Sequence, residues 1–79
     1  MTEPAPLPGA AAALSVSVNG EVRRLAGGTT LAALVATLTT AHSGVAAAVN
    51  ETVVPRGQWS ATALLDGDRV EVLTAVQGG

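Results

Sequence analysis

One apolar stripe limits the fold of this chain more than any other feature of its sequence. The residues that form it fall at positions i, i+3, i+4 and i+7, the spacing of one face of an amphipathic helix, and are Leu31, Leu34, Val35 and Leu38. Thr29 or Thr30 can cap the start of this helix, and His42-Ser43-Gly44 is expected to end it. The flanking segments have the patterns of strands. We therefore expect an α+β fold in which a sheet covers one main helix.

Short strands are predicted on both sides of the helix. Leu14–Val18 alternates apolar and polar residues, as a half-buried strand does. The Asn19-Gly20 pair that follows is a strong hairpin signal because both residues tolerate positive φ. Further strands are predicted at 21–25, 45–49, 52–54 and 69–76, with a turn or single helical turn at 56–60 and a turn at 66–68.

Composition argues against several classes of function. The chain has 79 residues, enough for one small domain, and with no cysteine and a single histidine neither disulfides nor a zinc site are expected. Its basic residues are four arginines and its net charge is −2, which argues against nucleic-acid binding. No apolar run reaches the roughly 18 residues of a membrane span, and the first residues lack the pattern of a secretory signal. We expect a cytoplasmic protein without a bound cofactor or metal.

The two ends of the chain have different patterns. Residues 1–13 contain alternate prolines and a run of alanines, so we expect a disordered N-terminal extension and a folded domain over residues 14–79. Val76 ends the last predicted strand, and Val76-Gln77-Gly78-Gly79 is expected to form a flexible tail that can enter a narrow channel, because glycine has no side chain. The reactive group at its tip is the carboxylate of Gly79. A carboxylate is a poor acyl electrophile, so chemistry there needs activation, most simply by an adenylyl group from ATP.

Several residues allow both a structural and a functional interpretation. Asp66 and Asp68 fit an aspartate–glycine turn better than acid–base or metal chemistry, and His42 fits a helix cap better than a catalytic base. Trp59 is expected to cover the core, and Arg56 is either solvated or in contact with a partner. Leu73 breaks the polar side of the last strand, which is explained equally well by a partner surface and by a chance exposed leucine.

The order of these motifs resembles the ThiS family, the sulfur carriers of thiamin biosynthesis. The residues that carry the resemblance are Val18-Asn19-Gly20-Glu21, Gly28-Thr29-Thr30-Leu31, Ala48-Val49-Asn50, Val54-Pro55-Arg56 with Trp59, Asp66-Gly67-Asp68, and Gly78-Gly79. They cover nearly all of residues 14–79, whereas the Pro/Ala-rich leader departs from the family pattern. The resemblance implies a β-grasp, ubiquitin-like fold with a mixed sheet.

The resemblance also implies a function for the tail. A ThiF-like adenylyltransferase would use ATP to adenylate Gly79, and a persulfide from a cysteine desulfurase would replace the nucleotide and leave a thiocarboxylate. A ThiG-like thiazole synthase would then take the sulfur, so the protein would be a co-substrate and not an enzyme. Gly78 would allow close approach, Val76 and Gln77 would hold the tail as it leaves the sheet, and Leu73 with Arg56 would contribute to docking.

Other functions remain open from the sequence. The carrier could serve another sulfur pathway, such as that of molybdopterin. A ubiquitin-like modifier joined to other proteins through Gly79, or a non-covalent β-grasp interaction module, would also fit the predicted architecture. The module is the alternative for which Gly78 and Gly79 would be dispensable.

Overall fold

The computed structural model describes residues 13–40 and 43–74. Five strands and two helical segments follow one another along this part of the chain: β1 (Leu14–Val18), β2 (Glu21–Leu25), α1 (Leu31–Leu38), β3 (Val45–Val49), β4 (Thr52–Val54), the 3-10 helix η1 (Arg56–Ala61) and β5 (Arg69–Thr74). These elements match the predicted order. The last strand was predicted to reach Val76, but Ala75 and the residues after it lie outside the described part, where β5 ends at Thr74.

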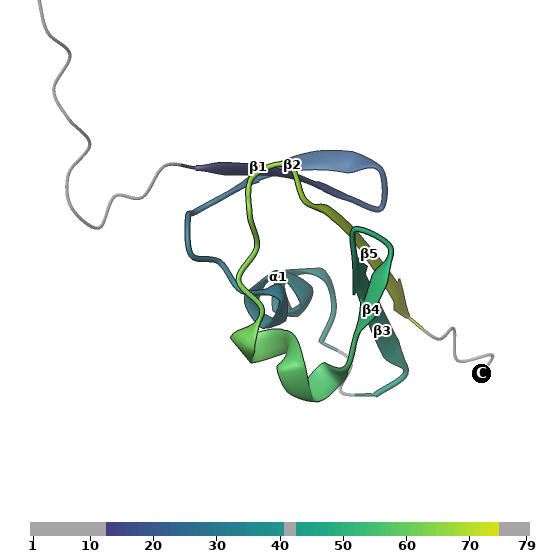
Figure 1. The fold of residues 1–79 in the computed structure, drawn as a ribbon. Helices are drawn as coiled ribbons and strands as arrows, with labels where there is room; N and C mark the ends of the chain where they lie inside the picture. The colour runs from purple at the N-terminus through teal and green to yellow at the C-terminus, as the bar shows by residue number, and fades with distance from the viewer. Residues whose placement is uncertain (1–12, 41–42, 75–79) are drawn as a thin grey trace, which may run out of the picture.

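The strands form one mixed sheet that curls over α1 (Figure 1). Its order is β2-β1-β5-β3-β4, with β1 and β5 parallel and every other pair antiparallel. Asn19 and Gly20, at φ 50° and 86°, form the tight turn between β1 and β2 that the sequence predicts. The parallel pair lies in the middle of the sheet, so the first and last strands of the described chain are neighbours.

The core lies between the inner face of the sheet and the apolar stripe of α1. Leu31, Leu34 and Val35 are almost fully buried, as the helical spacing predicts. Trp59 covers one side of this core with 5% of its surface exposed, and its indole N–H donates to the Val54 carbonyl at 2.8 Å. The buried residues are otherwise aliphatic and comprise Val16, Val18, Leu31, Leu34, Val35, Ala47, Leu64, Val70 and Val72.

The helix begins as predicted but ends earlier. Thr30 is its N-cap, and the Thr30 hydroxyl accepts the Ala33 N–H at 3.1 Å. The expected end at His42-Ser43-Gly44 is wrong, because the helix stops at Leu38 and Thr39 already has extended backbone angles. Thr37 donates its hydroxyl to the Leu34 carbonyl at 2.7 Å. Closely spaced β-branched threonines lower helix propensity, and such side-chain bonds compete with the regular helix ladder.

Candidate functional site

Strand β5 leads the chain toward the predicted tail, and its outward side chains lie on the face of the sheet opposite α1. Val70 and Val72 point into the core, whereas Leu73 is 70% exposed. The break in alternation that Leu73 makes in the sequence therefore places a large apolar side chain in solvent. Exposed leucines that stand alone need no explanation, so its surroundings decide whether it belongs to a larger surface.

Leu73 belongs to a small apolar surface on the outer face of the sheet. Register pairs Leu73 with Ala46 on β3, and Ala48 on β3 pairs with Val53 on β4. Val53 is 72% exposed, so two large apolar side chains flank two small ones. We call Ala46, Ala48, Val53 and Leu73 the outer apolar patch. It lines most of a shallow hollow of about 180 Å³ whose polar rim is formed by Asn19 and Glu71.

Arg56 lies on the other side of the sheet, at the start of η1. A 3-10 helix has three residues per turn, so Arg56 and Trp59 line up on the same side. The Arg56 guanidinium carbon lies 5.2 Å from the centre of the Trp59 ring, within cation–π distance. A groove of about 530 Å³ runs between α1 and η1, and we call it the Arg56 groove; its lining is Ala32, Val35, Ala36, Thr39, Thr40, Arg56, Trp59 and Ser60.

The structure does not bring the two predicted docking residues together. Leu73 is on the outer face, whereas the Arg56 groove is walled by α1 and η1, which lie on the inner side of the sheet (Figure 1). A single flat partner surface cannot cover both. The other predicted site residues are Val76, Gln77, Gly78 and Gly79, and these lie outside the described residues, as does His42.

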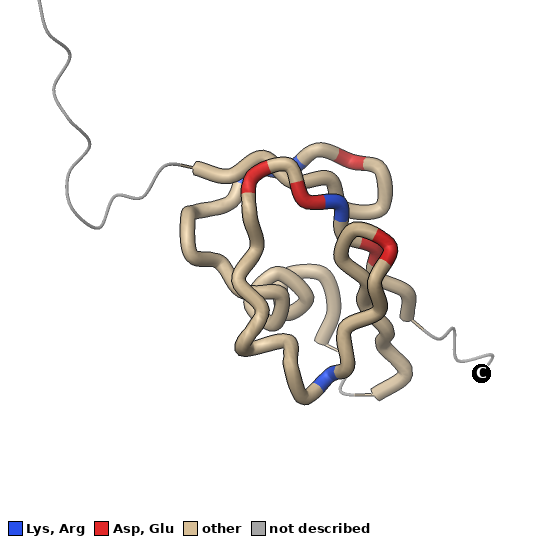
Figure 2. The backbone as a smooth tube through the Cα atoms, viewed as in Figure 1, with Lys and Arg blue, Asp and Glu red and all other residues tan. Residues whose placement is uncertain are grey.

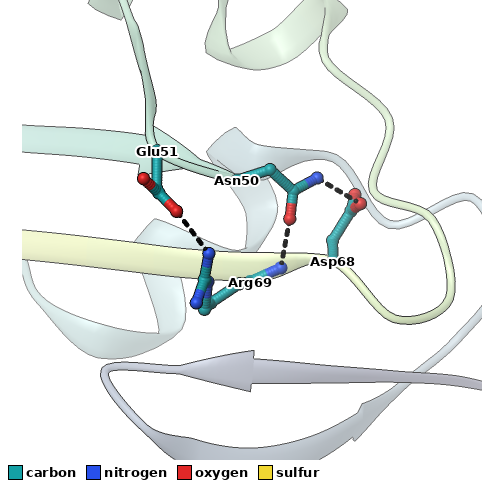
Figure 3. A network of polar contacts seen from close by, with 4 residues as sticks. All are labelled: Asn50, Glu51, Asp68 and Arg69. Carbon is teal, nitrogen blue, oxygen red and sulfur yellow. Dashed lines mark hydrogen bonds and ion pairs between the residues drawn. The ribbon is translucent and has the colours of Figure 1, made fainter.

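The predicted turn at Asp66-Gly67-Asp68 is confirmed, and its carboxylates bind backbone and side-chain donors. Asp66 accepts the Ser15 N–H at 2.7 Å, and Asp68 accepts the Leu65 N–H at 2.8 Å. Asp68 also accepts from the Asn50 side chain at 2.9 Å, as Figure 3 shows. These bonds hold the 66–68 turn against β1 and the β3–β4 turn. The plain structural interpretation therefore accounts for both aspartates.

The Asn50 side chain extends this network to the first residue of β5. Its carbonyl oxygen accepts the Arg69 backbone N–H at 2.9 Å, and the Arg69 side chain pairs with Glu51 at 2.7 Å (Figure 3). Asn50 and Glu51 both have positive φ, so the β3–β4 turn presents its side chains to β5. Over residues 13–40 and 43–74 there is no group of three or more side chains suited to hold a metal ion. In the same ranges no helix has the length and apolar character needed to cross a membrane.

Sequence reasoning missed most of the outer apolar patch and the groove. Val53 carries no signal in the sequence, because a three-residue strand is too short for alternation to assign its faces. Ala46 and Ala48 lie beside Leu73 and Val53 only because of the register among the three strands β3, β4 and β5. The groove depends on how η1 packs against α1. The spacing of three between Arg56 and Trp59 was a usable signal, since it places both on one side of a 3-10 helix.

Comparisons with known proteins agree with the fold and with the predicted family. Residues 16–79 match the model of the ThiS family. The sulfur carrier protein ThiS of Escherichia coli (strain K12) is 30% identical over 66 residues, which cover 84% of this chain and all of that protein. The crystal structure of a thiamine biosynthesis protein (ThiS) from Geobacter metallireducens superposes with a TM-score of 0.68 at 30% identity, over 84% of this chain and all of that one. A solution structure of a thiamine biosynthesis protein from the same organism gives the same TM-score over 88% of its own chain.

Proposed function

The chain belongs to the ThiS family of sulfur carriers and has the β-grasp fold of that family. From this premise we propose that the carboxyl group of Gly79 carries the sulfur atom that is transferred in thiazole synthesis. The observation that carries the proposal is the extent of the family match, which spans residues 16–79 and so includes Gly79. The outer apolar patch supports it, because one of its two large residues, Leu73, lies near the end of β5, the last strand before the predicted tail.

The chemistry follows from the state of the carboxylate. A carboxylate oxygen of Gly79 attacks the α-phosphorus of ATP on a ThiF-like adenylyltransferase, and pyrophosphate leaves. The terminal sulfur of a persulfide then attacks the acyl carbon, and AMP leaves. A thiol then attacks the partner's sulfur in the resulting acyl disulfide, so that a new disulfide forms between the thiol and the partner and the thiocarboxylate leaves. The chain itself has no cysteine, so both the persulfide and the thiol come from partner proteins. A cysteine desulfurase is one source of the persulfide.

Positioning is the contribution that this chain makes to the transfer. An oriented acyl group reacts far faster than one that must be found by collision, so the carrier must hold its tail in a defined place on each enzyme. Val76 and Gln77 would hold the tail as it leaves the sheet, and Gly78 would let the backbone enter a narrow channel. The patch around Leu73 would dock the folded domain. A ThiG-like thiazole synthase then takes the sulfur, and the free carboxylate returns for another cycle.

Intact-mass analysis tests the proposal directly. The full chain is incubated with ATP, the adenylyltransferase and the desulfurase of the same organism, and a persulfide source. We expect a product in which one oxygen is replaced by sulfur, and no such product from a chain that lacks Gly78 and Gly79. A carrier that stays unmodified beside an adenylyltransferase of proven activity would contradict the proposal. Rescue of a thiazole auxotroph, and not of a molybdopterin auxotroph, assigns the pathway.

A further inference from the structure

We propose that the Arg56 groove is a second docking site of the carrier and that it receives a carboxylate-bearing segment of a partner protein. The inference rests on the proposed sulfur-carrier function, because it concerns the enzymes that handle the tail. It adds a surface on the side of the domain formed by α1 and η1, distinct from the outer apolar patch. Three features favour this occupant: the charge of the groove, its shape and the way Arg56 is held.

Arg56 is a cation without a carboxylate within salt-bridge distance in the part of the chain that the structure describes. Arg23 pairs with Glu21 at 3.2 Å and Arg69 pairs with Glu51 at 2.7 Å. None of the described residues that line the groove is acidic. Figure 2 shows the acidic positions gathered around the turns at the other end of the sheet, away from η1. A carboxylate that the described residues do not supply is therefore the complementary group for this position, and a partner protein can provide it.

The remaining surface of the groove suits a protein segment better than a free anion. Helix α1 has no charged residue, and it contributes Ala32, Val35 and Ala36 to the wall. Ser60 and Thr40 add hydroxyl groups at the rim. A small inorganic anion would use only the guanidinium. A peptide segment that carries an aspartate or glutamate next to an apolar side chain would use the cation and the apolar wall together.

Trp59 prepares Arg56 for this contact. The ring is fixed by its hydrogen bond to the Val54 carbonyl and by burial, so the guanidinium rests on a rigid surface. A cation held in this way loses less side-chain entropy on binding than a free surface arginine does. Arg23 and Arg24 on the edge strand β2 have no such support among the described contacts. This difference is the reason why the groove, and not the β2 edge, is assigned as the acidic-segment site.

The experiment measures the carrier concentration needed for half-maximal rate in two reactions. The first is ATP–pyrophosphate exchange by the adenylyltransferase, and the second is sulfur transfer from the charged carrier to thiazole synthase. Full-length wild type, Arg56→Gln, Arg56→Lys and Arg56→Glu are compared. We expect Arg56→Gln to raise the half-saturating concentration about three- to tenfold in at least one reaction at low salt, and Arg56→Glu to raise it further. Arg56→Lys should recover part of the loss. The difference from wild type should shrink as salt is added.

Arg24→Glu is the matched control, because it makes the same change in net charge on another exposed part of the domain. The proposal is overturned if Arg24→Glu and Arg56→Glu raise the half-saturating concentration equally in both reactions, or if Arg56→Gln has no effect in either. It is also overturned if free acetate or phosphate slows hydrogen exchange of the Arg56 guanidinium, as measured by NMR, as much as the partner proteins do. A wild-type chain that is never charged would instead contradict the sulfur-carrier function, whatever the Arg56 variants do.

Discussion

At the scale of single residues, the side chain of Asn19 takes the place of a backbone peptide. The Asn19 N–H donates to the Val70 carbonyl at 2.9 Å, as in a parallel ladder. The side-chain amide then donates to the Val72 carbonyl at 3.1 Å and accepts the Val72 N–H at 2.9 Å. The pairing of β1 with β5 thus continues beyond the last residue of β1. The sequence marked Asn19 only as a turn residue, and this second role depends on a strand 53 positions away.

Replacement of Asn19 by alanine should destabilise the domain by about 2–4 kcal/mol. It leaves the two polar groups of Val72 without partners and puts a non-glycine side chain without local hydrogen bonds at positive φ. Asn19→Gly also removes these hydrogen bonds, but glycine adopts positive φ without strain, so the free energy of unfolding should fall by about 1–3 kcal/mol. Urea unfolding of both variants measures the difference. An Asn19→Gly protein as stable as wild type would show that the Val72 bonds contribute nothing.

A substitution of Asp68 tests whether its carboxylate stabilises the fold or takes part in the formation of the thiocarboxylate. Its carboxylate accepts the Leu65 N–H and the Asn50 side-chain N–H, so Asp68→Ala should lower the free energy of unfolding by about 1–3 kcal/mol. The folded fraction should still be converted to the thiocarboxylate at the wild-type rate. Circular dichroism and the mass assay, run at a temperature where the variant is folded, separate the two effects. Loss of charging in a fully folded variant would contradict the structural role.

At the scale of elements, the N-terminus of α1 is held by two kinds of contact. The Thr30 hydroxyl caps the Ala33 N–H, and the Thr62 carbonyl accepts the Leu31 N–H at 2.8 Å. The segment between η1 and β5 therefore satisfies a donor that a free helix end would leave to water. The return contact from the Leu64 N–H to the Thr29 carbonyl, at 2.9 Å, ties that segment to the loop before the helix.

Thr30→Ala should cost about 1 kcal/mol because it removes the side-chain cap and leaves the backbone contacts in place. Thr30→Ser keeps a hydroxyl that can cap and should retain most of the stability. Thr40→Ala is the control beyond the other end of the helix, where Thr40 is exposed and lies two residues after the last helical residue, Leu38. Thermal unfolding of the three variants ranks them. Equal losses for alanine and serine at position 30 would argue against capping.

Elements whose signal is local were predictable from the sequence, and contacts between them were not. The stripe of α1, the Asn19-Gly20 turn and the 66–68 turn each depend on a few adjacent residues, and the structure confirms all three. The early helix end was missed because a glycine stop signal at Gly44 outweighed the weak propensity of the threonines before it. The outer apolar patch required the register of β3 with two neighbours, which no local pattern encodes.

At the scale of the whole molecule, the two faces of the sheet carry apolar residues of different exposure. The inner face of the sheet holds the core, and the outer face carries apolar residues that add little to folding. Val22 and Leu73 are exposed to nearly the same extent, 71% and 70%. They differ in position, because Leu73 lies in the outer apolar patch on β5 whereas Val22 lies on the edge strand β2. A docking role predicts that the two residues differ in function although they match in exposure.

Leu73→Thr should therefore weaken the interaction with the activating enzyme without destabilising the carrier. Threonine is β-branched, a shape that strands favour, and it removes part of an apolar contact, so the half-saturating carrier concentration should rise about three- to tenfold. The free energy of unfolding should change by about 0.5 kcal/mol or less, since the side chain is exposed. Val22→Thr should match Leu73→Thr in urea unfolding and match wild type in ATP–pyrophosphate exchange. If Val22→Thr impaired exchange as much as Leu73→Thr did, exposure alone would explain the effect, and the outer apolar patch would have no special role in docking.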